Sequence, residues 1–404
     1  MSMSMDGGGC TIRIYDRELN WIYESKSCDS VQLTRELYGP GTFEIHIHPD
    51  KLGFSPSGDW GFSESLGGAG GGLAAYSGHL PANRHPFQKN NIITFNLDGH
   101  RSGLIREFHL EERSGRREYV VYGETGASLT GQRIVVPPTR WENPNALGWE
   151  RIRGPAETVI KHFAAMNMTS PGDSARRFSD LILAADLRRG IDFPWQARFG
   201  PLDEVLRDIC SFADMGYEIY ADIENRRWIF DVIPGTDRTK NQTALSPVSF
   251  NMEFQNIESY RYLEEYRNFR NTGYAGGEGE DENRLIYILG GENTGHDRFE
   301  TFLDCGMARN INELIHYGTQ RLSEFREIKS LELSALPKVF RFEKDYFLGD
   351  KVSVYISRLG LSIDARITTV REIWERQGGY RAQIRFGAGL PSIHDVLGRA
   401  GSVR

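Results

Sequence analysis

The sequence predicts a mainly β fold with an α+β insertion. Many short segments near both ends of the 404-residue chain alternate apolar with polar residues, which is the pattern of half-buried strands. Between them, apolar residues recur at spacings of three and four, as on one face of a helix. We therefore expect two barrel-like β domains flanking a small α+β module.

The length of the chain requires more than one domain, because single hydrophobic cores stop growing near about 250 residues. Hydrophobic residues make up 39% of the chain and charged residues 25%, an ordinary globular composition. The expected boundaries are an N-terminal β domain over 1–136, a middle module over 137–246, a C-terminal β domain over 247–391 and a tail over 392–404.

The first domain is expected to consist of short strands separated by turns such as the one at 38–41. Its strands are predicted at 11–15, 21–23, 31–33, 41–48, 91–95, 102–111 and 118–123. Between 49 and 86 the composition changes to Gly, Ser and Ala, with a glycine-rich run at 67–72. Such a segment buries too little apolar area to hold a core, so a flexible loop inserted in the first domain is predicted.

The middle module is predicted to contain two helices and a hairpin. One helix is expected over 156–166, directly after a proline that suits a first turn, and the other over 202–212. Strands at 217–222 and 227–232 form the hairpin. In the last domain a helix is predicted over 311–326, with strands at 259–262, 267–274, 284–289, 329–336, 351–356, 361–372 and 380–386.

The charge balance and the terminus exclude some partners and locations. Lys and Arg total 48 against 55 acidic residues, a formal net charge of −7, so the chain lacks the positive field that duplex binding requires. The N-terminus has no basic region followed by an apolar stretch, and no run of about 18 apolar residues occurs. We expect no nucleic-acid specificity, no membrane segment, and a chain made and kept in the cytoplasm until it is released.

Metal and cofactor sites have weak support in the sequence. His46 and His48 lie two apart on a predicted strand and project from one face, where they could hold a metal with a third ligand. A solvated sheet face explains them equally well, and we expect neither metal nor cofactor. The cysteines form no CxxC or Cys/His cluster and are expected to be buried or indifferent thiols: Cys10, Cys28, Cys210 and Cys305.

Catalytic candidates are equally sparse. Glycosidases need two facing carboxylates. One Gly-rich loop contains four acidic residues: Glu278, Glu280, Asp281 and Glu282. Such a cluster is more often a solvated turn than a catalytic pair. Asp345, Asp350 and Asp364 lie beside turns, where Asp bonds to the local backbone. There is no GxSxG elbow, and the glycine run at 67–72 precedes neither a lysine nor a clear helix. We expect no catalytic residue.

Arginines alternate with aromatic residues at 260–262, 266–270 and 340–342. This pattern could stack on sugars or bases. In a strand it also gives one apolar and one charged face, as a subunit packed in a ring would have, and we favour an interface.

The order of several segments resembles the baseplate-hub and tail-associated proteins of long-tailed phages, a family also present in contractile bacteriocin-like particles. Each motif is loose by itself, but their order along nearly the whole chain is specific. The motifs are YDREL at 15–19, RELYGPGTFE at 35–44, GQRIVVPP at 131–138, YAGGEGE at 274–280, GHDR at 295–298 and YFLGDKV at 346–352.

The resemblance implies two tube-type domains per chain and a homotrimeric ring, whose six quasi-equivalent positions match a hexameric tail tube. It implies a structural hub that joins the tube to a central spike or tip, with tail tube, distal tail, tape measure and other baseplate proteins as partners. The expected location is a virion tail or tail-like particle assembled in the host cytoplasm. No catalytic residues are implied, and the insertion at 49–86 departs from the family.

Two alternatives remain open. One is a tail-associated cell-wall hydrolase that uses carboxylates near Glu278 and Asp281. The other is a tail module that binds the host surface. The hub interpretation expects any cell-wall hydrolysis to need a separate polypeptide.

Overall fold

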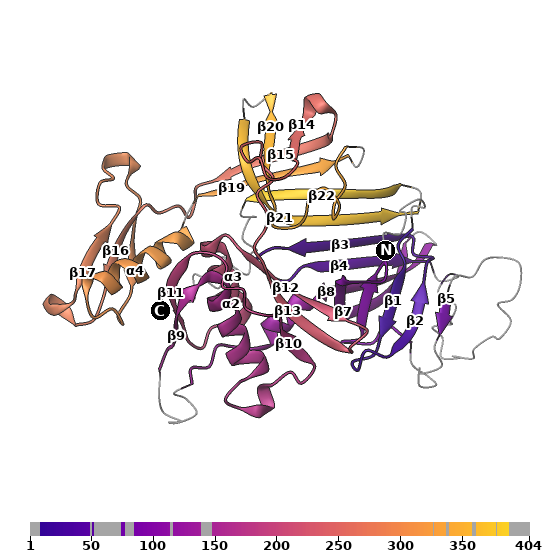
Figure 1. Ribbon diagram of the computed structural model, residues 1–404, viewed down its shortest axis with the longest axis horizontal. Coiled ribbons are helices and arrows are strands. Elements are labelled where there is room, and N and C mark those ends of the chain that lie inside the picture. The colour runs from indigo at the N-terminus through magenta and orange to yellow at the C-terminus, as the bar shows by residue number, and fades with distance from the viewer. Residues whose placement is uncertain are drawn as a thin grey trace, which may run out of the picture. The chain divides into compact units, whose positions relative to one another are not determined.

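A computed structural model describes residues 9–48, 51, 74–76, 85–113, 116–138, 148–325, 327–336, 339–357, 361–376 and 378–387. The chain divides into two compact units, and Figure 1 shows their elements. The first unit contains Met1–Ser259 and Ser334–Ile384, and the second contains Tyr260–Leu333 and Arg385–Arg404. Most of the loop predicted over 49–86, and all of the tail over 392–404, lie outside the described residues.

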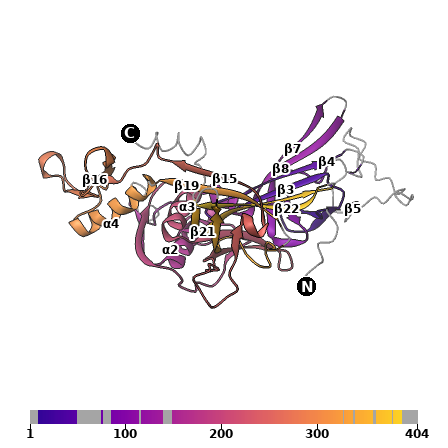
Figure 2. The ribbon, with the colours of Figure 1, turned by 90° about the horizontal axis from the view of Figure 1, so that it is seen from above.

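The prediction of a mainly β fold with an α+β insertion is confirmed. The N-terminal strands follow the order β3-β4-β8-β7-β6-β1-β2-β5 in the largest sheet. They are β1 (Ile12–Tyr15), β2 (Trp21–Ser25), β3 (Ser30–Glu36), β4 (Thr42–Ile47), β5 (Ala74–Tyr76), β6 (Ile92–Phe95), β7 (Asp98–Arg113) and β8 (Arg116–Thr125). Figure 2 shows β7 and β8 as a long hairpin. Alternate residues of β3 and β4, including Leu33, Phe43 and Ile45, are buried in the core beneath this sheet.

The C-terminal strands of the first unit join this same sheet. They are β20 (Lys351–Ile356), β21 (Leu361–Glu375) and β22 (Gly379–Gly387), and β14 (Ser249–Asn251) pairs with β20. The first half of β21 pairs with β20, and its second half pairs antiparallel with β3, from Thr369 opposite Glu36 to Glu375 opposite Ser30. β21 is long enough to pair with both β20 and β3. The described strands of the two predicted β domains therefore form one open sheet, and the expected closed barrels are not observed among them.

The middle module packs two helices against small sheets. Its elements are β9 (Glu150–Pro155), α2 (Ala156–Ala164), β10 (Leu181–Leu183), β11 (Asp192–Ala197), α3 (Leu202–Ala213), β12 (Gly216–Asp222) and β13 (Arg227–Ile233). Pro155 directly precedes α2, where its missing N–H costs no helical hydrogen bond. Both helices and the hairpin were predicted, but β9, β10 and β11 were not. Pro194 lies within β11, and a proline argues against a strand in sequence-based reasoning.

The motif at 35–44 lies where the module meets the sheet within the first unit. The amide of Leu37 donates to the carbonyl of Thr368 at 2.8 Å, and the carbonyl of Leu37 accepts from the amide of Tyr217 at 3.1 Å. A side chain at Gly41 would place its Cβ 2.0 Å from the carbonyl oxygen of Thr34. Leu37 therefore links the end of β3 to β21 and to the module, while the close approach to Thr34 requires glycine at position 41.

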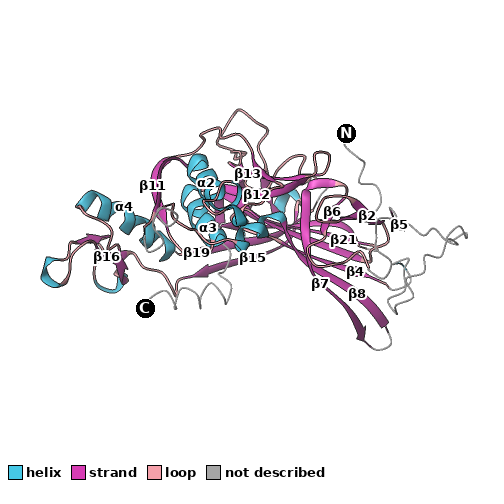
Figure 3. Ribbon diagram, turned by 90° about the horizontal axis from the view of Figure 1, so that it is seen from below, coloured by secondary structure: helices cyan, strands magenta, loops and turns pink. Residues whose placement is uncertain are grey.

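The second unit contains a three-stranded sheet covered on one face by a helix, as Figure 3 shows for α4 and β16. Its elements are β15 (Ile257–Glu265), β16 (Thr272–Gly276), β17 (Ile286–Leu289), β18 (Glu300–Asp304), α4 (Ile311–Leu322) and β19 (Ile328–Ala335), of which β15 and β19 cross the unit boundaries. β16 pairs antiparallel with β17 and parallel with β18. At Gly318, a Cβ would lie 2.7 Å from Leu289 and 2.9 Å from Ala275, so glycine allows α4 to approach the sheet closely.

No helix within the described ranges is long and apolar enough to cross a membrane.

Candidate functional site

One polar cluster in the first unit is a buried network of two arginines and two glutamates. Arg101 Nη2 lies 2.8 Å from Glu372 Oε1, and Arg101 Nε lies 3.1 Å from Glu372 Oε2. Glu343 contacts both arginines, at 2.5 Å from Arg35 Nη2 and 2.6 Å from Arg101 Nη2. Tyr380 donates its hydroxyl to Glu372 at 3.1 Å. The cluster thus joins β3, β7, β21 and β22.

Charge pairing opposes the effect of burial on the pKa of Glu343, Arg35 and Arg101 in this network. Burial would raise the pKa of Glu343, but Arg35 and Arg101 together hold that pKa below its usual range. Burial would likewise lower the pKa of Arg101, yet the carboxylate of Glu372 raises it. The Glu372 side chain is fully buried. Because a buried charge is tolerated only when it is paired and hydrogen-bonded, each member of the network depends on the others.

Asp350, in the motif at 346–352, forms a second buried junction. Its carboxylate accepts hydrogen bonds from the amide of Thr236 at 2.9 Å, from the amide of Phe347 at 2.9 Å and from Arg238 Nε at 2.7 Å. Gly349 has a φ of +88°, a conformation that favours glycine. Bonding to the local backbone was predicted for Asp350 and is confirmed, while its link to residues 236–238 was not foreseen.

A third cluster lies at the start of α2. Glu157 is fully buried and accepts hydrogen bonds from Lys161 Nζ at 2.7 Å, from Arg189 Nε at 2.8 Å and from the amide of Arg189 at 3.1 Å. Burial would raise the pKa of this carboxyl group, but the hydrogen bonds from Arg189 and Lys161 lower it to about 2. In its carboxylate form, Glu157 therefore holds the 185–189 segment against the start of α2, together with Lys161.

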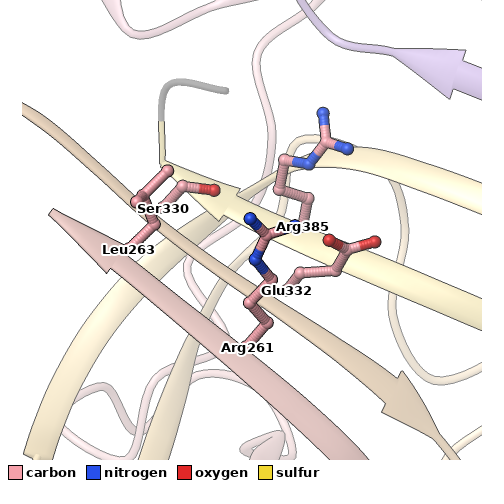
Figure 4. Close-up of a pocket in the computed structure, with 5 residues that line it drawn as sticks. All are labelled: Arg261, Leu263, Ser330, Glu332 and Arg385. Atoms are coloured by element: carbon pink, nitrogen blue, oxygen red, sulfur yellow. The ribbon is translucent and has the colours of Figure 1, made fainter. Parts of the chain in front are cut away.

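A small pocket lies within the second unit, between β15, β19 and the end of β22. Its volume is about 180 Å³, and its lining comes from Arg261, Leu263, Ser330, Glu332 and Arg385. Figure 4 shows the side chains of Arg261, Glu332 and Arg385 gathered at one side. Small-molecule sites usually have about 300–1,000 Å³ and mostly apolar walls, so this pocket does not fit a cofactor. Arg261 belongs to one of the arginine and aromatic runs noted in the sequence.

The predicted metal candidates are not brought together. His46 Nε2 lies 2.6 Å from Glu44 Oε1, and His46 Nδ1 lies 3.1 Å from Glu118 Oε2. Burial lowers the pKa of this imidazole, but the two carboxylates outweigh burial and raise it. No group of three or more His, Cys, Asp or Glu side chains in the described ranges is placed to hold a metal ion. The prediction of buried thiols is confirmed, because the four cysteines are buried and free: Cys10, Cys28, Cys210 and Cys305.

The acidic loop candidates remain on the surface. Asp281 begins a short 3-10 turn, and the side chains of the loop are exposed: Glu278, Glu280, Asp281 and Glu282. The aromatic run at 340–342 lies partly inside the first unit, where the guanidinium of Arg35 lies 4.9 Å from the ring centre of Phe342. Phe342 packs against the buried network, whereas Arg341 is exposed.

Sequence reasoning missed Arg101 and Glu372 as a pair, although a signal existed. On β21, Glu372 projects from the same face as Val370 and Trp374, and all three side chains are buried. On β3, Arg35 projects from the same face as Val31 and Leu33, which are also buried. A charged residue on the apolar face of an alternating strand indicates a buried ion pair.

Comparison with known proteins places the chain in a family. Residues 11–388 match the family described as "Siphovirus ReqiPepy6 Gp37-like protein". The search of curated proteins found no match.

Two solved structures share the fold over nearly their whole length. One is the 43 kDa tail protein of prophage MuSo2 from Shewanella oneidensis, at 10% identity, a TM-score of 0.55 and coverage of 94% of this chain and 98% of that chain. The other is the tail protein from Neisseria meningitidis MC58, at 11% identity, a TM-score of 0.54 and coverage of 94% and 97%. The resemblance to tail-associated phage proteins is confirmed, and the chain belongs to the siphovirus ReqiPepy6 Gp37-like family with the fold of phage tail proteins.

Proposed function

We propose that the chain is a structural baseplate hub protein of a phage tail or tail-like particle. The match to a siphovirus family over residues 11–388 carries this proposal. The fold shared with two tail proteins over 94% of the chain supports it. In this role the chain has no catalytic step.

The proposed assembly is a homotrimeric ring. The described sheet of the first unit is open, and an open sheet leaves edges that a ring can cover. Each chain supplies a set of N-terminal strands and a set of C-terminal strands, joined through β3 and β21. Three chains then present six related strand sets, which suits contact with a hexameric tail tube.

In the particle, the ring joins the tail tube to a central spike or tip. Its proposed neighbours are tail tube or distal tail proteins, the tape measure protein and other baseplate proteins. The ring assembles in the cytoplasm of the bacterial host and then remains in the virion tail. The buried clusters at Glu372 and Asp350 support a rigid connector, since both fasten segments distant in sequence.

The mass of the purified chain in solution tests this proposal. Light scattering after size-exclusion chromatography is expected to give three times the mass of one chain at micromolar concentration. A species that keeps the mass of one chain at every concentration, including under assembly conditions, contradicts the ring.

A further inference from the structure

One face of the three-stranded sheet in the second unit carries exposed apolar side chains, bordered on β18 by Glu300 and Asp304. Ile286 and Ile288 on β17 are 48% and 44% exposed, and Phe302 on β18 is 54% exposed. Tyr274 on β16 pairs with both Ile288 and Phe302, so these three side chains form one row across the sheet. We call Tyr274, Ile286, Ile288 and Phe302 the Phe302 face. α4 packs against the opposite side of the sheet through Leu314 and Gly318.

The composition of the Phe302 face differs from that of a solvated sheet surface. Sheets that face water on one side usually carry polar residues there, whereas β17 reads IYIL and is apolar on both sides. Two arginines lie over rings of this face, Arg284 over Phe302 and Arg298 over Tyr274. Both are paired, Arg284 with Asp304 and Arg298 with Glu300, each at 2.5 Å, so they form its polar border. Contiguous exposed apolar residues with a polar rim mark protein interaction sites.

The rim of the Phe302 face is acidic where β16 leads into β17. The connecting loop carries four exposed carboxylates that form no ion pair within the described part of the chain: Glu278, Glu280, Asp281 and Glu282. Ile286 follows this loop directly. A complementary partner therefore presents exposed apolar side chains beside unpaired arginines or lysines.

The first unit carries a surface with this chemistry. Leu187 and Ile191 are 63% and 55% exposed, and Arg188 between them is exposed. The amide of Glu157 donates to the carbonyl of Arg189 at 3.0 Å, and Asp192 pairs with Pro155 at the end of β9. These contacts hold the segment beside β9.

Two further arginines lie on β9. Arg151 and Arg153 are two apart on the strand and exposed, so they share a face. Arg153 pairs with Asp192 at 3.0 Å, whereas Arg151 and Arg188 form no ion pair with any described residue. We call Leu187, Arg188, Ile191, Arg151 and Arg153 the Leu187 surface.

We propose that the Phe302 face of one copy packs against the Leu187 surface of the next copy in the ring. This inference rests on the proposed function and names the contact that closes the trimer. The two surfaces differ, so the contact is head-to-tail, and head-to-tail contacts generate rings when the rotation closes. Apolar residues form its centre and opposite charges its border, the usual anatomy of a specific interface.

Substitution of the apolar centre is the first test. In the variant Ile288→Lys with Phe302→Lys, the affinity between copies is expected to fall by about tenfold or more, because centrally placed apolar side chains dominate interface energies. Leu245→Lys, at a first-unit residue that is 43% exposed, is the matched control and is expected to associate like the wild type. Thermal unfolding and circular dichroism check that each variant is folded.

Charge reversal then tests the pairing of the two surfaces. Glu280→Lys with Glu282→Lys, and separately Arg151→Glu with Arg188→Glu, are each expected to weaken trimer formation, measured by sedimentation at several concentrations. All four substitutions in one chain are expected to restore it, because every contact in the ring is then reversed on both sides.

The outcomes separate this contact from the hub proposal. A wild-type trimer that survives all these substitutions overturns the proposed contact and leaves the hub intact. If each double charge-reversal variant dissociates and the fourfold variant does not reassociate, the pairing of the two surfaces is overturned. A wild-type chain that stays monomeric overturns the proposed function and this contact with it.

Discussion

Replacing Glu372 with alanine is expected to lower the free energy of unfolding by about 3–5 kcal/mol, the usual cost of breaking a buried ion pair. The carboxylate is fully buried and bonds to Arg101 and Tyr380, with Arg35 at 3.3 Å. Its removal leaves two arginines in the interior with one glutamate, Glu343, between them. Urea denaturation at a fixed protein concentration measures the loss.

Glu375→Ala provides the matched control for this prediction. Glu375 lies on the same strand and pairs with Arg381 at 2.9 Å, but both side chains are more than one-third exposed. Exposed pairs of this kind contribute about 0–1 kcal/mol. Equal losses in the two variants would show that the buried network is not what joins β21 to β3 and β7.

The second large effect is a pH dependence at Glu157. The pKa of its carboxyl group is about 2 in the folded chain against an ordinary value of 4.5. A depressed folded pKa stabilises the fold above pH 4.5, and this contribution disappears as the pH falls toward 2. The difference corresponds to about 3 kcal/mol at neutral pH, since each pKa unit is worth about 1.4 kcal/mol.

Glu157→Gln tests this dependence because it keeps the shape of the side chain and removes the charge. The variant is expected to be less stable than the wild type at pH 7, and the gap is expected to narrow steadily as the pH falls below 4.5. Urea denaturation of both chains between pH 7 and pH 3 measures the gap. A gap of constant size across this range would contradict the assignment of the stabilisation to the carboxylate.

Much of the fold could be predicted from periodicity. Most described strands at both ends, the helices α2, α3 and α4, and the hairpin of β12 and β13 were anticipated, with boundaries displaced by a few residues. β5, inside the stretch predicted as a flexible loop, and β14 were not. The single sheet shared by the two ends of the chain could not be predicted. The pairing of β21 with β3 joins residues more than 300 positions apart, and the periodicity of a strand carries no information on which strand it pairs with. The domain boundaries at 136/137 and 246/247 stay predictions.

The candidate surfaces were only partly visible in the sequence. The residues 285–289 form a continuous apolar run, which is typical of a strand buried on both faces. In the structure α4 covers one face of β17, and Ile286 and Ile288 remain exposed on the other. An apolar run of this kind is usually covered on both faces, whereas the described chain covers only one face of β17. This difference is the physical reason to expect a partner on the face of Ile286 and Ile288.

Imaging an intact particle by electron cryo-microscopy tests the hub proposal most directly. The proposal predicts three copies of this chain in a closed ring at the end of the tail tube, in contact with the central spike or tip. Finding the chain at the periphery of the baseplate, along the length of the tube or in a number other than three would contradict it.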